Sequence, residues 1–101
     1  MTREGEVLQQ CLALLAIRGI QAWRNNVGMK GGYHYGKKGS ADITGILPGG
    51  RRLEIECKAG KGRLSPEQAD FLQMITEQGG FARCVYSVDE LIDALRREGV
   101  L

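Results

Sequence analysis

The chain has 101 residues, enough for one domain with a single hydrophobic core. Its formal net charge is only +2, which excludes binding to nucleic acid through overall charge and requires local basic clusters instead. Three widely spaced cysteines within apolar runs indicate neither a disulfide framework nor a zinc site. We recognise no signal peptide or membrane span, so we expect a soluble, intracellular protein that binds no membrane.

The first predicted elements are a helix and a strand. Apolar residues recur at helical spacing over residues 7–15, and Gly19 is placed to end that helix. Residues 20–27 have the composition of a strand. Trp23 and Met29 are expected to be packing residues rather than contacts to a ligand.

A glycine-rich segment, residues 24–38, follows and carries basic and aromatic side chains. Basic residues neutralise phosphates and aromatic rings stack on unpaired bases, so this segment is a candidate nucleic-acid contact. The alternative is a solvated loop. A second basic cluster lies at residues 58–63, and neither cluster indicates reading of base sequence. The candidate binding residues are Arg24, Lys30, Tyr33, Tyr35, Lys37, Lys38, Lys61 and Arg63.

The most informative feature is a predicted β-hairpin. Residues 44–47 and 51–57 are strand-like runs separated by residues 48–50, a proline followed by two glycines. If those three residues form the loop, pairing outward from it places Asp42 opposite Glu56, with Cβ atoms about 5 Å apart on one sheet face. A four-residue loop would instead put the two acids on different faces.

Alternation along the second strand gathers polar side chains on the face that carries both acids. They are Arg52, Glu54, Glu56 and Lys58. One interpretation is an ordinary solvated face, on which Lys58 pairs with Glu56 in water. Against it, two like charges set directly opposite destabilise a sheet, so the pair favours a bound cation.

The rest of the chain predicts two helices around one strand. Residues 65–68 form a capping box with Ser65 as N-cap and Gln68 reaching back, opening a helix that ends near Gln78. An apolar strand, residues 81–86, comes next. Residues 87–90 form a second capping box that opens a last helix, which Gly99 closes. The C-terminal Val100 and Leu101 are expected either to fray or to join an interface.

The element order is therefore one helix, three strands, a helix, a strand and a C-terminal helix. This order predicts an α/β fold with a central, mixed, four-stranded sheet flanked by helices. The fourth strand follows a crossover helix, so we expect it to be parallel to a neighbour. All 101 residues are expected to form one domain.

The chemistry of the opposed acids suits a hard divalent cation. Magnesium takes oxygen ligands in octahedral geometry and often holds one or two carboxylates together with substrate phosphates. Such an ion polarises a phosphodiester and lowers the pKa of bound water. Lys58, two residues after Glu56 on the same face, would orient that water or stabilise developing negative charge.

Three segments of the chain resemble the VRR-NUC (virus-type replication-repair nuclease) family of the PD-(D/E)XK nuclease superfamily: KGSADI at 38–43, ECK at 56–58 and LSPEQ at 64–68. The similarity covers nearly the whole chain and implies a restriction-endonuclease-like core, with Mg²⁺ or Mn²⁺ as cofactor. The chain departs from the family pattern at Ala41, where a proline commonly precedes the aspartate.

The resemblance implies a role for each motif residue. Asp42 and Glu56 are expected to bind the metal, with the Cys57 backbone carbonyl as third ligand and Lys58 as the catalytic lysine. Glu6 and Gln68 match the family's accessory acidic and glutamine positions. Each of these two also fits a purely structural role, since Gln68 completes a capping box and a carboxylate such as Glu6 is favoured near a helix start anyway.

The resulting expectation is a metal-dependent DNA endonuclease of replication, recombination or repair, in the cytoplasm of a bacterial or phage-infected host cell. By resemblance to stand-alone members of the family, its substrate is branched DNA such as a Holliday junction and its assembly a homodimer. A flap or nicking nuclease working with a partner protein fits the same residues. A non-catalytic nucleic-acid-binding module and a protein-interaction subunit are also compatible with the sequence.

Overall fold

The computed structural model describes residues 3–25, 28–30, 33–35 and 37–101. Its elements in chain order are α1 (Glu4–Ile17), β1 (Gln21–Arg24), β2 (Gly28–Lys30), β3 (Tyr33–Tyr35), β4 (Ile43–Ile46), β5 (Arg52–Cys57), α2 (Pro66–Glu77), β6 (Phe81–Val85) and α3 (Val88–Arg97). Four strands form one sheet in the order β1-β4-β5-β6, and β2 pairs with β3 in a separate hairpin. Within the described ranges, no helix is both long and apolar enough to cross a membrane.

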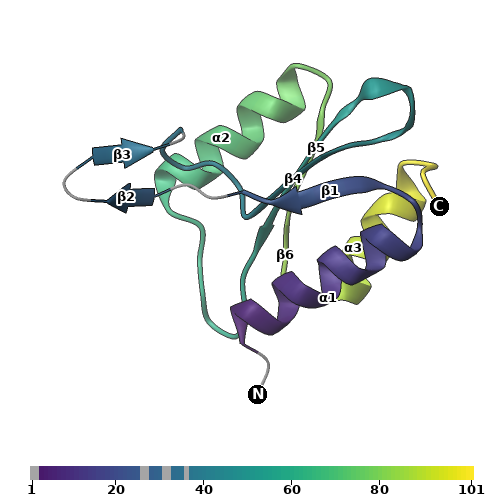
Figure 1. Ribbon diagram of the computed structural model, residues 1–101, viewed down its shortest axis with the longest axis horizontal. Coiled ribbons are helices and arrows are strands. Elements are labelled where there is room, and N and C mark those ends of the chain that lie inside the picture. The colour runs from purple at the N-terminus through teal and green to yellow at the C-terminus, as the bar shows by residue number, and fades with distance from the viewer. Residues whose placement is uncertain (1–2, 26–27, 31–32, 36) are drawn as a thin grey trace.

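The sheet lies between two helical layers, with α2 on one side and α1 and α3 on the other (Figure 1). The α1 and α3 side carries the larger core, in which Leu15, Leu53, Phe81 and Leu95 are fully buried. The α2 side carries a smaller cluster that includes Phe71 and Ile75 from the helix. The predicted α/β fold with a mixed four-stranded sheet is confirmed.

The predicted hairpin register is confirmed. In the antiparallel pair of β4 and β5, Ile43 lies opposite Ile55 and Thr44 opposite Glu54. Residues Pro48–Gly50 make a single 3₁₀ turn in which both glycines have positive φ, a conformation that favours glycine. One residue beyond the paired strands, this register sets Asp42 opposite Glu56. The fourth strand, β6, is parallel to β5 after the α2 crossover, as expected.

The helix boundaries follow the sequence signals closely. Gly19 adopts φ 72° directly after α1, and the Ile20 amide donates to the Leu15 carbonyl at 2.9 Å, a helix-ending pattern. Ser65 and Gln68 make the reciprocal capping box of α2. At α3 only one of the two contacts of the predicted capping box forms. The Ser87 hydroxyl accepts a hydrogen bond from the Glu90 backbone amide, but the Glu90 carboxylate accepts from the Tyr86 amide and not from the Ser87 amide.

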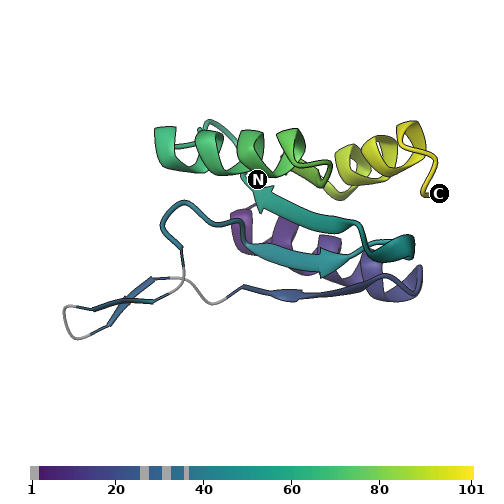
Figure 2. The same ribbon diagram turned by 90° about the horizontal axis from the view of Figure 1, so that it is seen from above.

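The largest difference from expectation lies in the glycine-rich segment. The first strand stops at Arg24 instead of residue 27, and the segment then forms β2 and β3, with Gly28 opposite Tyr35 and Lys30 opposite Tyr33. Figure 2 shows this hairpin projecting away from the body of the fold. The alternation of glycine with basic and aromatic residues gives it no apolar face that would have identified it as a hairpin.

Two smaller expectations are also resolved. Trp23 is 51% exposed, so the prediction that it packs in the core is wrong. Val100 and Leu101 pack against the larger core, so they are not frayed. The side chain of Met29 lies outside the described part of the structure.

Candidate active site

Asp42 is positioned by backbone contacts on both sides. It lies just before β4, and its Oδ2 accepts a hydrogen bond from the Cys57 amide at 2.9 Å. Its backbone carbonyl accepts from the Asn25 amide at 2.7 Å, which continues the pairing of β1 with β4 by one residue. These contacts fix the carboxylate on the α2 face of the sheet, at the end where β4 begins and β5 finishes.

Glu56 lies on the same face, one strand away, and is only 3% exposed. Its Oε2 is fully buried and has no hydrogen-bond partner. Burial first, then the hydrogen bond and the charge of Asp42, raise the pKa of Glu56 from 4.5 to about 9. A buried carboxyl with an orphaned oxygen and a neighbouring acid is a group that a cation would stabilise.

The donor set fits a hard divalent metal ion. Asp42 and Glu56 both offer carboxylate oxygens, the ligand type that magnesium and manganese favour. In the part of the chain that the structure describes, no three His, Cys, Asp or Glu side chains come close enough to hold an ion together. The two carboxylates would therefore need further ligands from the backbone, water or substrate, as is usual for magnesium.

Lys58 follows directly after β5, and its charge acts on Glu56 in the sense that lowers the Glu56 pKa. Its amide donates to the Val85 carbonyl at 3.0 Å, which keeps the residue in register with β6. The Tyr86 hydroxyl donates to the Gly62 carbonyl at 2.7 Å and holds the next loop against the sheet. The backbone at Lys58 is therefore fixed, and its side chain is half-buried.

The first helix presents a different acid to the site from the one expected. The buried residues of α1 include Leu8, Cys11 and Leu15, and the same helical face continues back to Glu4. The charge of Glu4 raises the Glu56 pKa, and a Cβ built on Gly62 would lie 3.4 Å from the Glu4 Oε2 atom. The predicted Glu6 is exposed and lines a separate concavity on α1 with Arg3 and Gln10.

Gln68 is committed to the helix cap. The side-chain Oε1 of Gln68 accepts a hydrogen bond from the Ser65 backbone amide at 2.9 Å. The backbone amide of Gln68 donates to the Ser65 hydroxyl at 3.1 Å. The structural role of Gln68 is thereby confirmed. Its side-chain NH₂ group is the part left for a substrate contact.

The interpretation of the polar face as an ordinary solvated surface is wrong for its two glutamates, because Glu54, like Glu56, is buried and is 0% exposed. Glu54 Oε2 accepts hydrogen bonds from the Thr44 hydroxyl and from Arg52 Nε, the latter at 2.9 Å. Its Oε1 is buried without a partner. Helix α2 packs over β5 and β6 and closes this face, which the hairpin pattern alone does not reveal.

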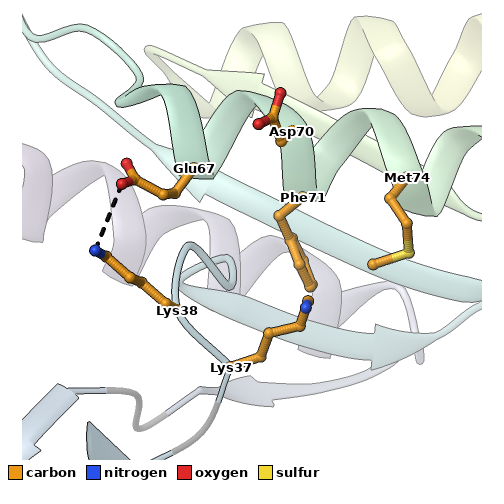
Figure 3. Close-up of a pocket in the computed structure, with 6 residues that line it drawn as sticks. All are labelled: Lys37, Lys38, Glu67, Asp70, Phe71 and Met74. Atoms are coloured by element: carbon orange, nitrogen blue, oxygen red, sulfur yellow. Dashed lines mark ion pairs between the residues drawn. The ribbon is translucent and has the colours of Figure 1, made fainter.

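The basic residues are spread around this end of the sheet. Lys37 and Lys38 line an open cavity of about 310 Å³ beside α2, in which Phe71 points toward the loop that carries Lys37 (Figure 3). Lys38 also pairs with Glu67 at 3.5 Å, an exposed contact of small energetic value. The side chains of Arg24, Lys61 and Arg63 reach the surface. The side chains of Lys30, Tyr33 and Tyr35 lie outside the described part of the structure.

Two cysteines meet beneath the site although they are far apart in the sequence. Cys11 of α1 and Cys57 of β5 are both buried and free, and the interaction with the Cys11 thiol, together with burial, raises the pKa of Cys57. They help α1 to pack against the strand that carries Glu56. Sequence spacing gave no sign of this contact.

Comparison with known proteins agrees with this geometry. The family model of the VRR-NUC domain matches residues 1–89. A solved structure titled "VRR_NUC domain" is similar over 96% of this chain and 97% of its own, with a TM-score of 0.71 at 22% identity. At that identity the likeness establishes the fold alone. No curated protein matches the chain significantly.

The fold and the family match define a nuclease domain of the PD-(D/E)XK type. The chain belongs to the VRR-NUC family, which confirms the resemblance seen in its three sequence segments. Nuclease domains of this type bind DNA and generally use divalent metal ions.

Proposed function

We propose that this protein is a divalent-metal-dependent endodeoxyribonuclease whose site consists of Asp42, Glu56 and Lys58. The observation that carries the proposal is the buried, unpartnered Glu56 Oε2 opposite Asp42. Two carboxyls held together at low exposure destabilise one another, and a divalent cation would remove that cost. The unit responsible is the whole of residues 1–101, since the larger core joins α1 to the C-terminal Leu101.

Asp42, Glu56 and the Cys57 backbone carbonyl would hold Mg²⁺ or Mn²⁺, which polarises a phosphodiester and makes hydroxide available near neutral pH. The chain's own residues position the substrate around it. The Cys57 amide orients the Asp42 carboxylate, and the Lys58 ammonium group stabilises negative charge that develops on the phosphate. Glu4, Glu6 and Gln68 are accessory groups at the same end of the fold, with Glu4 the nearer acid.

The proposed substrate is branched DNA, with a Holliday junction as the representative case, cut during replication, recombination or repair. A domain of 101 residues offers little surface with which to define a junction alone, and this supports a homodimer with two sites. The basic residues around the site are the proposed phosphate contacts, Arg24, Lys30, Lys37, Lys38, Lys61 and Arg63, with Tyr33 and Tyr35 as stacking residues. A flap or nicking nuclease that acts with a partner protein uses the same site.

A second candidate is a non-catalytic DNA-binding module. It is favoured by the raised pKa of Glu56 beside Asp42, since a protonated Glu56 would relieve the repulsion between the two carboxyls without metal. This candidate predicts binding that survives both chelator and the Asp42→Asn substitution. The nuclease predicts cutting that requires metal and both acids.

The test is cleavage of a labelled four-way DNA junction and of the matching linear duplex, each with manganese, magnesium or chelator. Symmetric, metal-dependent cuts in the junction that vanish in Asp42→Asn are expected. Glu98→Gln is the matched control, because Glu98 pairs with Arg51 and Arg83 at the opposite end of the sheet. Binding without cutting under every condition would overturn the nuclease.

A further inference from the structure

The only tryptophan of the chain is Trp23, and it lies on the surface with 51% of its area exposed. Burial of a large aromatic side chain contributes strongly to stability, so an exposed one calls for an explanation. It belongs to β1, an edge strand of the sheet. Its neighbour Ala22 packs against the larger core, so Trp23 points to the opposite, α2 side.

The α2 side of the sheet is only partly covered. Helix α2 packs on β5 and β6, and no described helix packs to a comparable extent on this side of β1 and β4. Figure 2 looks onto this face, with β4 and β1 lying clear of α2 and the hairpin β2–β3 projecting past them. Trp23 therefore sits on an open strip of sheet rather than under a helix.

This strip leads directly to the proposed site. Trp23 lies opposite Thr44, and the Asn25 amide pairs with the Asp42 carbonyl one step further along. Trp23 and Asp42 are thus diagonal neighbours on one sheet face, a relation that places Cβ atoms about 7–8 Å apart and within reach of an aromatic side chain. Thr44 and the buried Glu54 share the same face.

The geometry points to Trp23 as a substrate-binding residue that stacks on an unpaired base next to the phosphate to be cut. This inference rests on the proposed nuclease function and specifies its substrate class, namely DNA with an unstacked base at the cleavage site. Aromatic rings stack on any base face, and bases become available for stacking only where a duplex is interrupted. Lys37 and Lys38, in the loop that leads to Asp42, lie at the same end of the sheet to hold the flanking phosphates.

A second copy of the chain is the competing occupant, and the surface argues against it. Among the side chains that the structure describes, the exposed apolar residues of this strip are Trp23 and Ile46, which are diagonal neighbours with the polar Gln21 and Thr44 beside them. A stable interface buries about 800 Å² per partner around a continuous apolar centre. Two side chains do not supply that area.

Substitutions at Trp23 test the inference. Trp23→Ala should weaken binding to a forked duplex with unpaired thymidine arms by about 5- to 100-fold, with little change for the continuous duplex. Trp23→Phe keeps an aromatic ring and should retain most of the affinity. Ile46→Ala is the matched control, because Ile46 is similarly exposed but lies four residues from Asp42 along the chain, on the side of Trp23 away from the site, and its loss should leave binding unchanged.

The single tryptophan also provides a direct readout. In chelator, where no cutting occurs, titration with the fork should quench Trp23 emission, whereas the continuous duplex should quench it much less. Anisotropy of the same DNAs carrying a label measures binding separately. Unchanged Trp23 emission at a saturating concentration of the fork would overturn the inference. So would an equal loss of affinity for the fork and the duplex in Trp23→Ala, or the dissociation of a dimer in that variant measured by sedimentation.

These outcomes separate the two claims. Quenching by the fork without metal-dependent cutting would support the stacking role and refute the nuclease. Metal-dependent cutting with unchanged Trp23 emission would refute the stacking role and keep the nuclease. Failure to bind either DNA would overturn both.

Discussion

The two faces of the central sheet show how one small fold divides stability from function. The face under α1 and α3 is a continuous apolar layer in which Leu53, Ile55 and Phe81 are fully buried. The face under α2 mixes a small apolar cluster with two buried glutamates and an exposed tryptophan. Burial on the first face is favourable for every side chain. On the second face the burial of Glu56, whose Oε2 has no partner, carries a cost that a bound cation would offset.

The largest predicted effect is a loss of cutting, without a loss of stability, when a residue of the proposed site is substituted. Asp42→Asn, Glu56→Gln and Lys58→Ala should each lower the rate of DNA cutting by at least about 100-fold, because each removes a charge at the reacting centre. DNA affinity in chelator and the melting temperature should change little. Cleavage kinetics, anisotropy and thermal melting of the same preparations check this. A variant that unfolds would assign its residue to stability instead.

A substitution on the face that packs against α1 and α3 should lower stability and leave the cutting rate nearly unchanged. Leu53→Ala truncates a fully buried side chain within the larger core and should lower the free energy of unfolding by about 2–5 kcal/mol. Cutting per folded molecule at low temperature should remain close to that of the unmodified protein. Urea titration and single-turnover kinetics measure the two quantities. Loss of activity in a folded Leu53→Ala protein would show that the two faces are coupled.

The pH dependence of stability should reveal the raised pKa of Glu56. The folded protein keeps a proton on Glu56 up to about pH 9, whereas the unfolded chain loses it near 4.5. Stability in chelator should therefore fall as pH rises between these values, by at most about 1.4 kcal/mol per pH unit. Glu56→Gln should flatten this trend in denaturant titrations. A wild-type profile that rises over the same range would contradict the buried, protonated state.

The two acids of the first helix should differ. Glu4→Gln is expected to reduce cutting about tenfold, because the Glu4 carboxylate adds negative charge beside Glu56 that would favour the proposed cation. Glu6→Gln is the matched control in the same turn of α1; both acids are exposed, but only the charge of Glu4 is among those that shift the Glu56 pKa, which predicts a smaller effect for Glu6→Gln. Parallel cleavage rates decide between them. A larger effect of Glu6→Gln would restore the assignment made from the sequence.

The smallest effect should come from the cap of α2. Ser65→Ala removes the side chain that accepts from the Gln68 amide and should cost about 1 kcal/mol of stability. Gln68→Ala removes the reciprocal contact, so any loss of cutting beyond that of Ser65→Ala isolates a substrate role for its NH₂ group. Equal activity of the two variants would leave Gln68 as a cap alone.

Local signals predicted the backbone of the site well. The three-residue loop at Pro48–Gly50 determines the register of β4 and β5, and register alone decides that Asp42 and Glu56 share a face. Capping and glycine signals likewise located the ends of α1 and α2. These features depend on residues within a few positions of one another.

Features that depend on tertiary packing were not predictable in the same way. The burial of Glu54 and Glu56 arises because α2 packs over their face, and the exposure of Trp23 arises because α2 stops short of β1. Glu4 was missed although its spacing from Leu8, Cys11 and Leu15 follows the buried helical face. Applying that periodicity to the acidic residues would have selected it over Glu6.

Binding of a divalent metal ion by Asp42 and Glu56 can be measured by Mn²⁺ titration followed by electron paramagnetic resonance. The measurement is made with the protein alone and saturated with a four-way junction, using Asp42→Asn and Glu56→Gln for comparison and Glu98→Gln as control. We expect saturable Mn²⁺ binding by the unmodified protein and by Glu98→Gln, and none by either site variant. Equal Mn²⁺ binding by the unmodified protein and Glu56→Gln would contradict this expectation.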